Sequence, residues 1–263
     1  IVVNTLISFS LAAGALSAYK FAVSLHLFPI NIIGSAIAQV ALPNLVESCD
    51  DENKYCKVLN SAVQKALFLV LPIVSVLIIL RLPLVRLAYG VGAFDWRATI
   101  LTAWCLVLLS FSVVGQSIVQ ILLRAFYALK ETWLPLVAIT IGIIVNIGFA
   151  FLLTNFLSHY YDWRPIIEQM FLQVRDVNSQ EFYPVFGSFL RDSLRWATTR
   201  GTSDLAVGGL SLSLSLSYLV EMVVLSLLLN LKIKVITWKK TIIPSFKKLV
   251  NASLMCLGMY FCF

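Results

Sequence analysis

The stretch LPLVAITIGIIVNIGFAFLL, residues 134–153, runs for 20 residues without a charged side chain. A helix that spans a membrane needs about 20 apolar residues, because each residue rises about 1.5 Å and the hydrocarbon core is about 30 Å thick. Residues 61–80, 99–123 and 206–229 are similarly long and almost free of charge. Strands of a membrane barrel would instead alternate over about 10 residues. The runs predict an all-α, polytopic membrane protein.

The composition of the 263 residues agrees with this: 60% are hydrophobic, 13% are charged, and the mean hydropathy is +0.90. A soluble protein has about 45–50% apolar and about 25% charged residues. This chain carries too little charge to cover a water-facing surface. A soluble enzyme, a disordered chain and a disulfide scaffold are therefore excluded, and we expect no nucleic-acid partner despite the net charge of +7.

The pattern predicts about seven transmembrane segments, two of them incomplete. Transmembrane helices occupy 1–155, an extracytoplasmic insert with amphipathic helices follows at 156–205, and another transmembrane helix at 206–230. A basic cytoplasmic loop at 231–248 precedes an incomplete transmembrane helix at 249–263. Since the chain begins at Ile1 without a methionine and its last segment has 15 residues, we expect a part of a longer chain, truncated at both ends.

The orientation follows from six lysines and no acids within 231–248. Short loops rich in lysine and arginine stay in the cytoplasm. By alternation, the loops at 43–60 and 129–133 are also cytoplasmic, whereas 14–17, 81–98 and 156–205 face outward.

One segment gives conflicting signals. Residues 210–217 read LSLSLSLS, an alternation typical of a strand. A lone strand cannot satisfy its backbone hydrogen bonds in lipid. We therefore predict a helix, whose serines lie on two faces suited to close helix packing.

A polar stripe follows the segment 18–42. On a helix that turns about 100° per residue, five polar residues fall within an arc of roughly 100°, and His26 points the other way. They are Lys20, Ser24, Asn31, Ser35 and Gln39. The stripe predicts the wall of a hydrated substrate cavity. The alternative is that Lys20 extends to the membrane surface and the others are packing contacts.

Further polar residues lie in the other segments. Gln116, Gln120 and Arg124 share one helix face, where an interfacial anchor is favoured. Glu221 lies near the middle of 206–230, where structural pairing and ion coupling remain equal alternatives. Because neither His26 nor His159 belongs to a metal pattern and no catalytic grouping is present, we expect no enzyme, metal or cofactor.

Three stretches stand out as motifs: LLRAFYALKETWLPLVAITIGIIVNIGFAFLL at 122–153, LVRLAYGVGAFDWRAT at 84–99 and FPINIIGSAIAQVALPNL at 28–45. Together they resemble the MviN/MurJ-type lipid II flippases of the MOP exporter superfamily. Residues 122–153 are similar to the family signature "RAFYALxDTxTPxxI…N", through Arg124, Phe126, Tyr127, Pro135 and Asn146. Residues 84–99 resemble the family's "YxxGxF" turn, with Gly92 and Phe94 in place. Residues 28–45 resemble a third family segment through Pro29, Gly34 and Pro43. Residues 208–221, GGLSLSLSLSYLVE, resemble the start of a late core helix of the family.

The resemblance implies a MATE-like bundle of two lobes, with this chain forming most of the second. It implies alternating access in the bacterial cytoplasmic membrane, with lipid II, membrane lipids and a possible coupling ion as partners. Asn4, Asn146 and Glu221 are then candidates for ion coupling. The alternatives are another exporter of the superfamily, for a polysaccharide-lipid or a drug, and a non-transporting scaffold for cell-wall synthesis.

The sequence departs from the family in two places. The family usually has an arginine where this chain has Ser24, in the run Ala22-Val23-Ser24-Leu25. Lys20 lies one turn away on the same face, and we expect it to supply the missing cation. The insert at 156–205 is longer than the family's usual connection.

Overall fold

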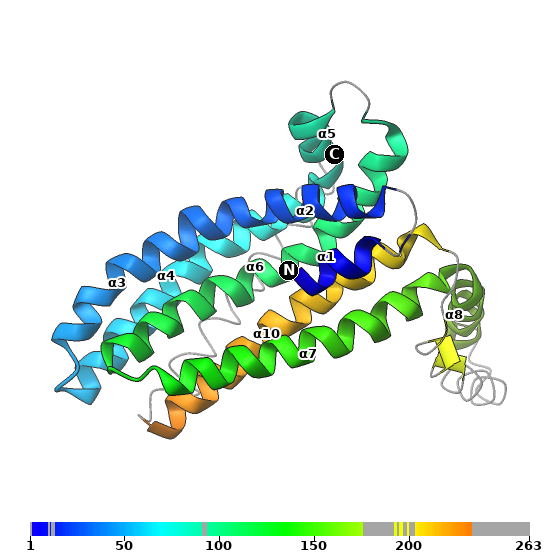
Figure 1. Cartoon of the computed structure of the whole chain (residues 1–263). Helices are drawn as coiled ribbons and strands as arrows, with labels where there is room; N and C mark the ends of the chain where they lie inside the picture. Colours follow the sequence, from blue (N-terminus) through cyan, green and yellow to red (C-terminus); the bar gives the residue numbers. More distant parts are fainter. Residues whose placement is uncertain are drawn as a thin grey trace.

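The computed structural model describes residues 2–9, 11, 14–90, 94–175, 192–193, 195–196, 199 and 203–232. Within this part of the chain all regular secondary structure is helical, which confirms the predicted all-α class (Figure 1). The elements are α1 (Val2–Phe9), α2 (Ala15–Pro29), the π-helical η1 (Ile30–Gly34), α3 (Ser35–Glu47), α4 (Glu52–Ile79), α5 (Arg81–Tyr89), α6 (Trp96–Ala128), α7 (Trp133–Ser158), α8 (Tyr160–Arg175), η2 (Asp204–Ala206) and α10 (Val207–Lys232).

Five helical stretches of the described residues are long and apolar enough to cross a membrane. They are Ala15–Glu47, Glu52–Ile79, Trp96–Ala128, Trp133–Ser158 and Asp204–Lys232. The polytopic architecture is thereby confirmed. The total of seven segments stays a prediction, since α1 has eight residues and residues 249–263 lie outside the described part.

Specific contacts hold the helix ends together at each end of the bundle. At one end, Lys232 of α10 forms an ion pair with Glu131, and the Cys49 thiol donates to the carbonyl of Ala128 at 3.2 Å. At the other end, Arg97 of α6 pairs with Asp204 of η2. The turns that follow α3 and α6 and the end of α10 therefore share one end, and α5 and α8 lie at the opposite end (Figure 1).

The long helix α6 lies at the centre and packs against α2, α3, α4, α5 and α10 (Figure 1). Its buried side chains contribute to two apolar clusters along the bundle. Leu106 and Leu109 belong to the cluster nearer α5, and Ile121 and Phe126 belong to the cluster nearer the α3–α4 turn. α7 contacts the bundle chiefly through α10 and leaves much of its apolar surface exposed, as expected for a helix that faces lipid.

The alternating serines of α10 lie in a helix, as predicted, and face two neighbours. The Ser215 hydroxyl donates to the carbonyl of Leu108 in α6 at 2.5 Å, and the Ser217 hydroxyl donates to the carbonyl of Gly142 in α7 at 2.7 Å. Interhelical hydrogen bonds of this kind contribute about 0.6 kcal/mol each in membrane proteins. Small residues thus allow α10 to pack closely against α6 and α7 at once.

Two stretches contain more helix than the hydropathy pattern indicates. Residues 81–98 include α5, and α7 extends to Ser158 before α8 begins at Tyr160. α8 lies in the stretch where the sequence predicts a first amphipathic helix. The segments 176–191 and 233–263, which include part of the predicted insert and most of the basic loop, lie outside the described residues.

Candidate functional site

The predicted polar stripe lies on one continuous rod formed by α2, η1 and α3. Its exposed members are Lys20, Ser24, Asn31 and Gln39, and Ser35 is half-buried. His26, on the opposite side of the rod, is fully buried and hydrogen-bonds through Nδ1 to the carbonyl of Val23 at 3.0 Å. The rod therefore presents its polar side outward and packs its other side against the bundle.

The polar groups of the stripe differ in what they can offer a ligand. The Ser24 hydroxyl donates to the carbonyl of Lys20 at 3.0 Å, and the Ser35 hydroxyl donates to the carbonyl of Asn31. Both hydroxyls are thus engaged with their own helix. Within the described residues, the ammonium of Lys20 and the amides of Asn31 and Gln39 have no side-chain partner, so these three groups are available to a ligand.

A π turn divides the rod. The backbone N–H of Ser35 bonds to the carbonyl of Ile30, five residues earlier, just after Pro29. A π turn changes the register of the residues that follow, so a constant 100° per residue does not describe this segment. The arc of roughly 100° predicted for the five polar residues on a regular helix therefore needs correction. Gly34 allows the rod to approach α6 here: a Cβ at Gly34 would lie 3.1 Å from Oγ of Ser117.

The second polar face, on α6, is separate from the stripe. Gln116, Gln120 and Arg124 are half-buried. The Arg124 guanidinium lies 6.0 Å from the centre of the Tyr127 ring, near the end that carries the α6–α7 turn. This position agrees with an interfacial anchor.

The three candidates for ion coupling lie along α10 at different levels. The Asn4 amide donates to the Leu210 carbonyl at 3.1 Å and to the Tyr19 hydroxyl at 3.3 Å. Glu221 follows Leu210 by eleven residues of helix, or about 16 Å. A Cβ at Gly142 would lie 3.4 Å from Oε2 of Glu221, which places this carboxyl against α7.

Asn146 lies one turn beyond Gly142 on the same face of α7, between those two levels. Both Asn146 and Glu221 are 7% exposed, and within the described residues the Glu221 carboxyl has no ion-pair partner. The three side chains form a row of buried polar groups, too extended for one coordination shell.

The family-motif residues are distributed over the rod, the α5–α6 connection, α6 and α7. Pro29 precedes the π turn and Gly34 is its last residue, Pro43 is an exposed residue of α3, and Phe126 and Pro135 are buried. Phe94 packs edge-on against Phe21, with ring centres 5.6 Å apart, and so joins the α5–α6 connection to α2. Gly92 lies outside the described residues.

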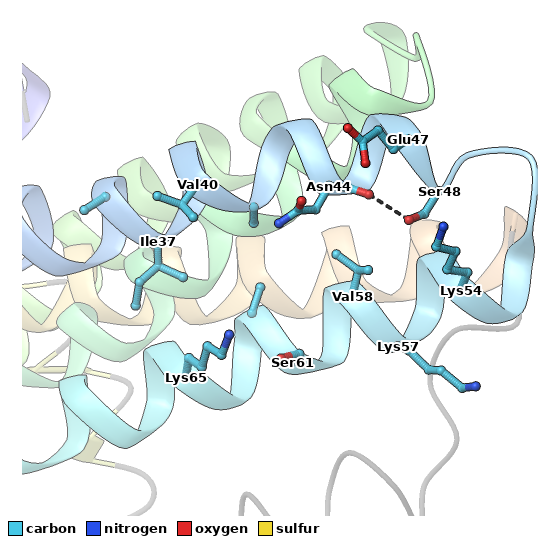
Figure 2. Close-up of a pocket in the computed structure, with 13 residues that line it drawn as sticks. Ile37, Val40, Asn44, Glu47, Ser48, Lys54, Lys57, Val58, Ser61 and Lys65 are labelled. Carbon is cyan, nitrogen blue, oxygen red and sulfur yellow. Dashed lines mark hydrogen bonds between the residues drawn. The ribbon is translucent and has the colours of Figure 1, made fainter.

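Sequence reasoning missed a groove between α3 and α4 with a volume of about 550 Å³ (Figure 2). Its lining includes Lys54, Lys57 and Lys65 of α4. The available signal was Lys65, a charged residue inside the apolar run 61–80. Its relation to α3 cannot be deduced from spacing, because it depends on which helices pack side by side.

The fold and the exposed polar rod define a class of protein: a multi-pass helical membrane protein with polar side chains along one exposed face of its bundle. The family model described as lipid II flippase MurJ matches residues 1–161. The chain belongs to this family and is a multi-pass protein of the cytoplasmic membrane.

Curated relatives carry similar names. A probable lipid II flippase MurJ of Rickettsia prowazekii is 30% identical over 161 residues, which cover 59% of this chain and 32% of the relative. Its counterpart in Thermotoga maritima is 32% identical over 150 residues, 56% of this chain and 31% of the relative. For that of Rhizobium meliloti the identity is 27% over 153 residues, 56% of this chain and 29% of the relative. The chain thus aligns with about 30% of the length of these relatives.

A solved structure described as lipid II flippase MurJ in an inward closed conformation has a similar fold. The TM-score is 0.63 at 20% identity, and the match covers 94% of this chain and 41% of that chain. The similarity extends beyond the family match, so the described helices after residue 161 belong to the same architecture.

Proposed function

We propose that the full-length protein moves a lipid-linked peptidoglycan precursor of the lipid II type from the inner to the outer face of the cytoplasmic membrane. It would do so by alternating access and without a chemical reaction. The observation that carries this proposal is the family match over residues 1–161, which includes the whole polar rod. In this proposal residues 1–155 and 206–230 contribute to the second lobe of a two-lobed bundle.

The test is complementation in bacteria whose own lipid II flippase can be switched off. The protein is expressed at its full natural length, and the amount of precursor that reaches the outer face is measured. Restored exposure supports the proposal. If the protein is detected in the membrane and no precursor reaches the outer face, the proposal is contradicted. Another exporter or a scaffold is then favoured.

Within this proposal Lys20 supplies the cation for the diphosphate of the substrate. Lys20 is exposed on the rod one turn from Ser24, the position where the family usually has an arginine. An ammonium acts as a point charge, whereas an arginine can make two parallel hydrogen bonds to a phosphate. We expect Lys20→Ala to reduce flipping at least tenfold, because one charge-assisted hydrogen bond contributes about 1.5–3 kcal/mol.

Restoring the charge at the neighbouring position tests this role. In the Lys20→Ala background, Ser24→Arg should recover flipping, because the new guanidinium lies on the same exposed face. Lys130→Ala, which removes an exposed charge in the α6–α7 turn, is the matched control and should leave flipping unchanged. If Lys20→Ala has no effect while other changes on the rod abolish flipping, the role assigned to Lys20 is wrong.

The row formed by Asn4, Asn146 and Glu221 is proposed as the place where a coupling ion acts. Glu221 is the only acid of α10, and an acid inside a membrane is costly unless it is protonated, paired or hydrated. Glu221→Gln keeps the shape and removes the charge. We expect it to abolish the dependence of flipping on an imposed ion gradient while the protein still folds. If the dependence of flipping on the ion gradient is unchanged in this variant, Glu221 is a packing residue.

A further inference from the structure

The groove between α3 and α4 combines apolar walls with cationic side chains. Ile37 and Val40 line it from α3, and Val58 lines it from α4 (Figure 2). Lys54 and Lys65 extend into it from α4, at either side of Val58 (Figure 2). The groove lies at the end of the bundle that carries the α3–α4 turn, the end predicted to be cytoplasmic.

The charge of the groove is not neutralised. Its lining holds three lysines and a single acid, Glu47. Within the described residues, none of Lys54, Lys57 and Lys65 forms an ion pair. Lys57 points away from α3 in Figure 2, so Lys54 and Lys65 are the two cations that face the groove.

The two cations lie at different depths. Lys54 is in the first turn of α4, and Lys65 is eleven residues, or about 16 Å, further along the helix. Long side chains on a helix lean toward its N-terminus, so the ammonium of Lys65 is directed toward the Lys54 end. An unpaired ammonium inside a membrane-spanning helix is costly unless it reaches water or an anion. A bound anion between the two lysines would remove that cost.

The surface around the groove is apolar and exposed. Val40, which lines the groove, is 70% exposed, and Phe68, three residues beyond the lining residue Lys65, is 66% exposed. Surfaces of this kind on membrane-spanning helices contact hydrocarbon chains, so an occupant of the groove meets cations and acyl chains together. An inorganic anion matches only the cations, and an apolar helix matches only the walls. An anionic amphiphile matches both.

We propose that this groove binds an anionic glycerophospholipid of the surrounding leaflet. Its phosphate lies between Lys54 and Lys65, with the amide of Asn44 available from α3, and its acyl chain follows Ile37, Val40 and Val58. Anionic lipids attract basic residues close to the membrane surface. The proposal does not depend on the transport activity, because it concerns a lipid of the bilayer and a different face of α3 from the polar stripe.

The test uses the protein at its full natural length, reconstituted in phosphatidylcholine vesicles that contain a small fraction of phosphatidylglycerol with a photoactivatable acyl chain. After illumination the labelled peptides are identified by mass spectrometry. We expect labelling of residues 36–48 and 54–65. The double variant Lys54→Gln/Lys65→Gln should lower this labelling at least tenfold, since each lysine near the surface contributes on the order of fivefold.

Three controls make the test specific. Lys130→Gln removes a lysine at the same end of the bundle, away from the groove, and should keep the labelling. Lys54→Arg/Lys65→Arg should also keep it, which separates lost charge from misfolding. Labelling of the exposed face of α7, at Ile143 and Ile144, provides an internal reference for general contact with lipid.

Three results would overturn the proposal. The first is no labelling in the groove of the unmodified protein. The second is equal labelling there by photoactivatable phosphatidylcholine. The third is labelling that a lipid-linked wall precursor displaces at an equimolar amount and excess phosphatidylglycerol does not, which would assign the groove to the transport substrate.

Discussion

Gly209 marks a close approach of α10 to α7. A Cβ at this position would lie 2.5 Å from both Cα and N of Thr154. These are backbone atoms and cannot turn aside, so Gly209→Ala must push the two helices apart. We expect a loss of about 1–3 kcal/mol of stability, the usual cost of overpacking, measured as a lower melting temperature in detergent.

Gly148→Ala is the matched control for this prediction. Gly148 also lies in α7, but nothing lies within 4 Å of a Cβ placed there. Alanine is the better helix former by roughly 1 kcal/mol, so this variant should melt at the same or a higher temperature. Equal losses in the two variants would show that α10 and α7 do not pack as closely as the structure has them.

The sequence predicts the relative positions of some functional side chains and not of others. The alignment of Lys20 with Ser24 could be predicted, because a spacing of three or four residues fixes a helix face, whereas the register beyond the π turn could not. The relation between Lys54, Lys65 and α3 could not, since it depends on which helices are neighbours. The same limit applies to Asn4 and Glu221, which the sequence groups by residue type and the structure separates by three turns of α10.

At the scale of the element, α4 begins at a defined capping residue. The Asp51 carboxylate accepts hydrogen bonds from the backbone N–H groups of Asn53 and Lys54, at 2.9 and 3.2 Å. Asp51→Ala leaves these amides without a partner. We expect a cost of about 1 kcal/mol and faster amide hydrogen exchange at both residues.

Two variants at the α3–α4 turn check that this effect is local capping. Asp51→Asn should keep the slow exchange, because asparagine is an equally good capping residue. Asp50→Ala removes the neighbouring exposed carboxylate, which accepts no capping bond, and should change neither exchange nor stability. A similar effect of Asp50→Ala would point to the charge of the turn and not to the cap.

Long helices follow directly from apolar runs, whereas their irregularities do not. The runs at 99–123 and 134–153 predict α6 and α7 because hydrocarbon tolerates no unsatisfied backbone. Pro29 signals a kink in this segment but not the π turn at Ile30–Gly34, which lies where Gly34 packs against Ser117 of α6. The helix α5 has nine residues, too few for a hydropathy signal to distinguish from a connection.

At the scale of the whole molecule, the contacts at the two ends of the bundle show which helix ends lie together. They do not show which end faces the cytoplasm. The ion pair between Lys232 and Glu131 and the pair between Arg97 and Asp204 place the α6–α7 turn and the start of α10 at opposite ends. The orientation prediction rests on the lysines of 231–248, which attract that loop to the cytoplasmic side.

Cysteine accessibility measures this orientation. In a cysteine-free background, Asp50→Cys places a thiol in the α3–α4 turn and Tyr161→Cys places one at the start of α8; both side chains are exposed. With a maleimide that does not cross membranes, we expect Tyr161→Cys to react in intact spheroplasts and Asp50→Cys to react only after permeabilisation. The reverse pattern would show that the Lys54–Lys65 groove lies in the outer leaflet and that the polar rod has the opposite orientation in the membrane. Reaction of both thiols in intact spheroplasts would contradict the bundle itself, because the structure separates these two positions by the length of α7.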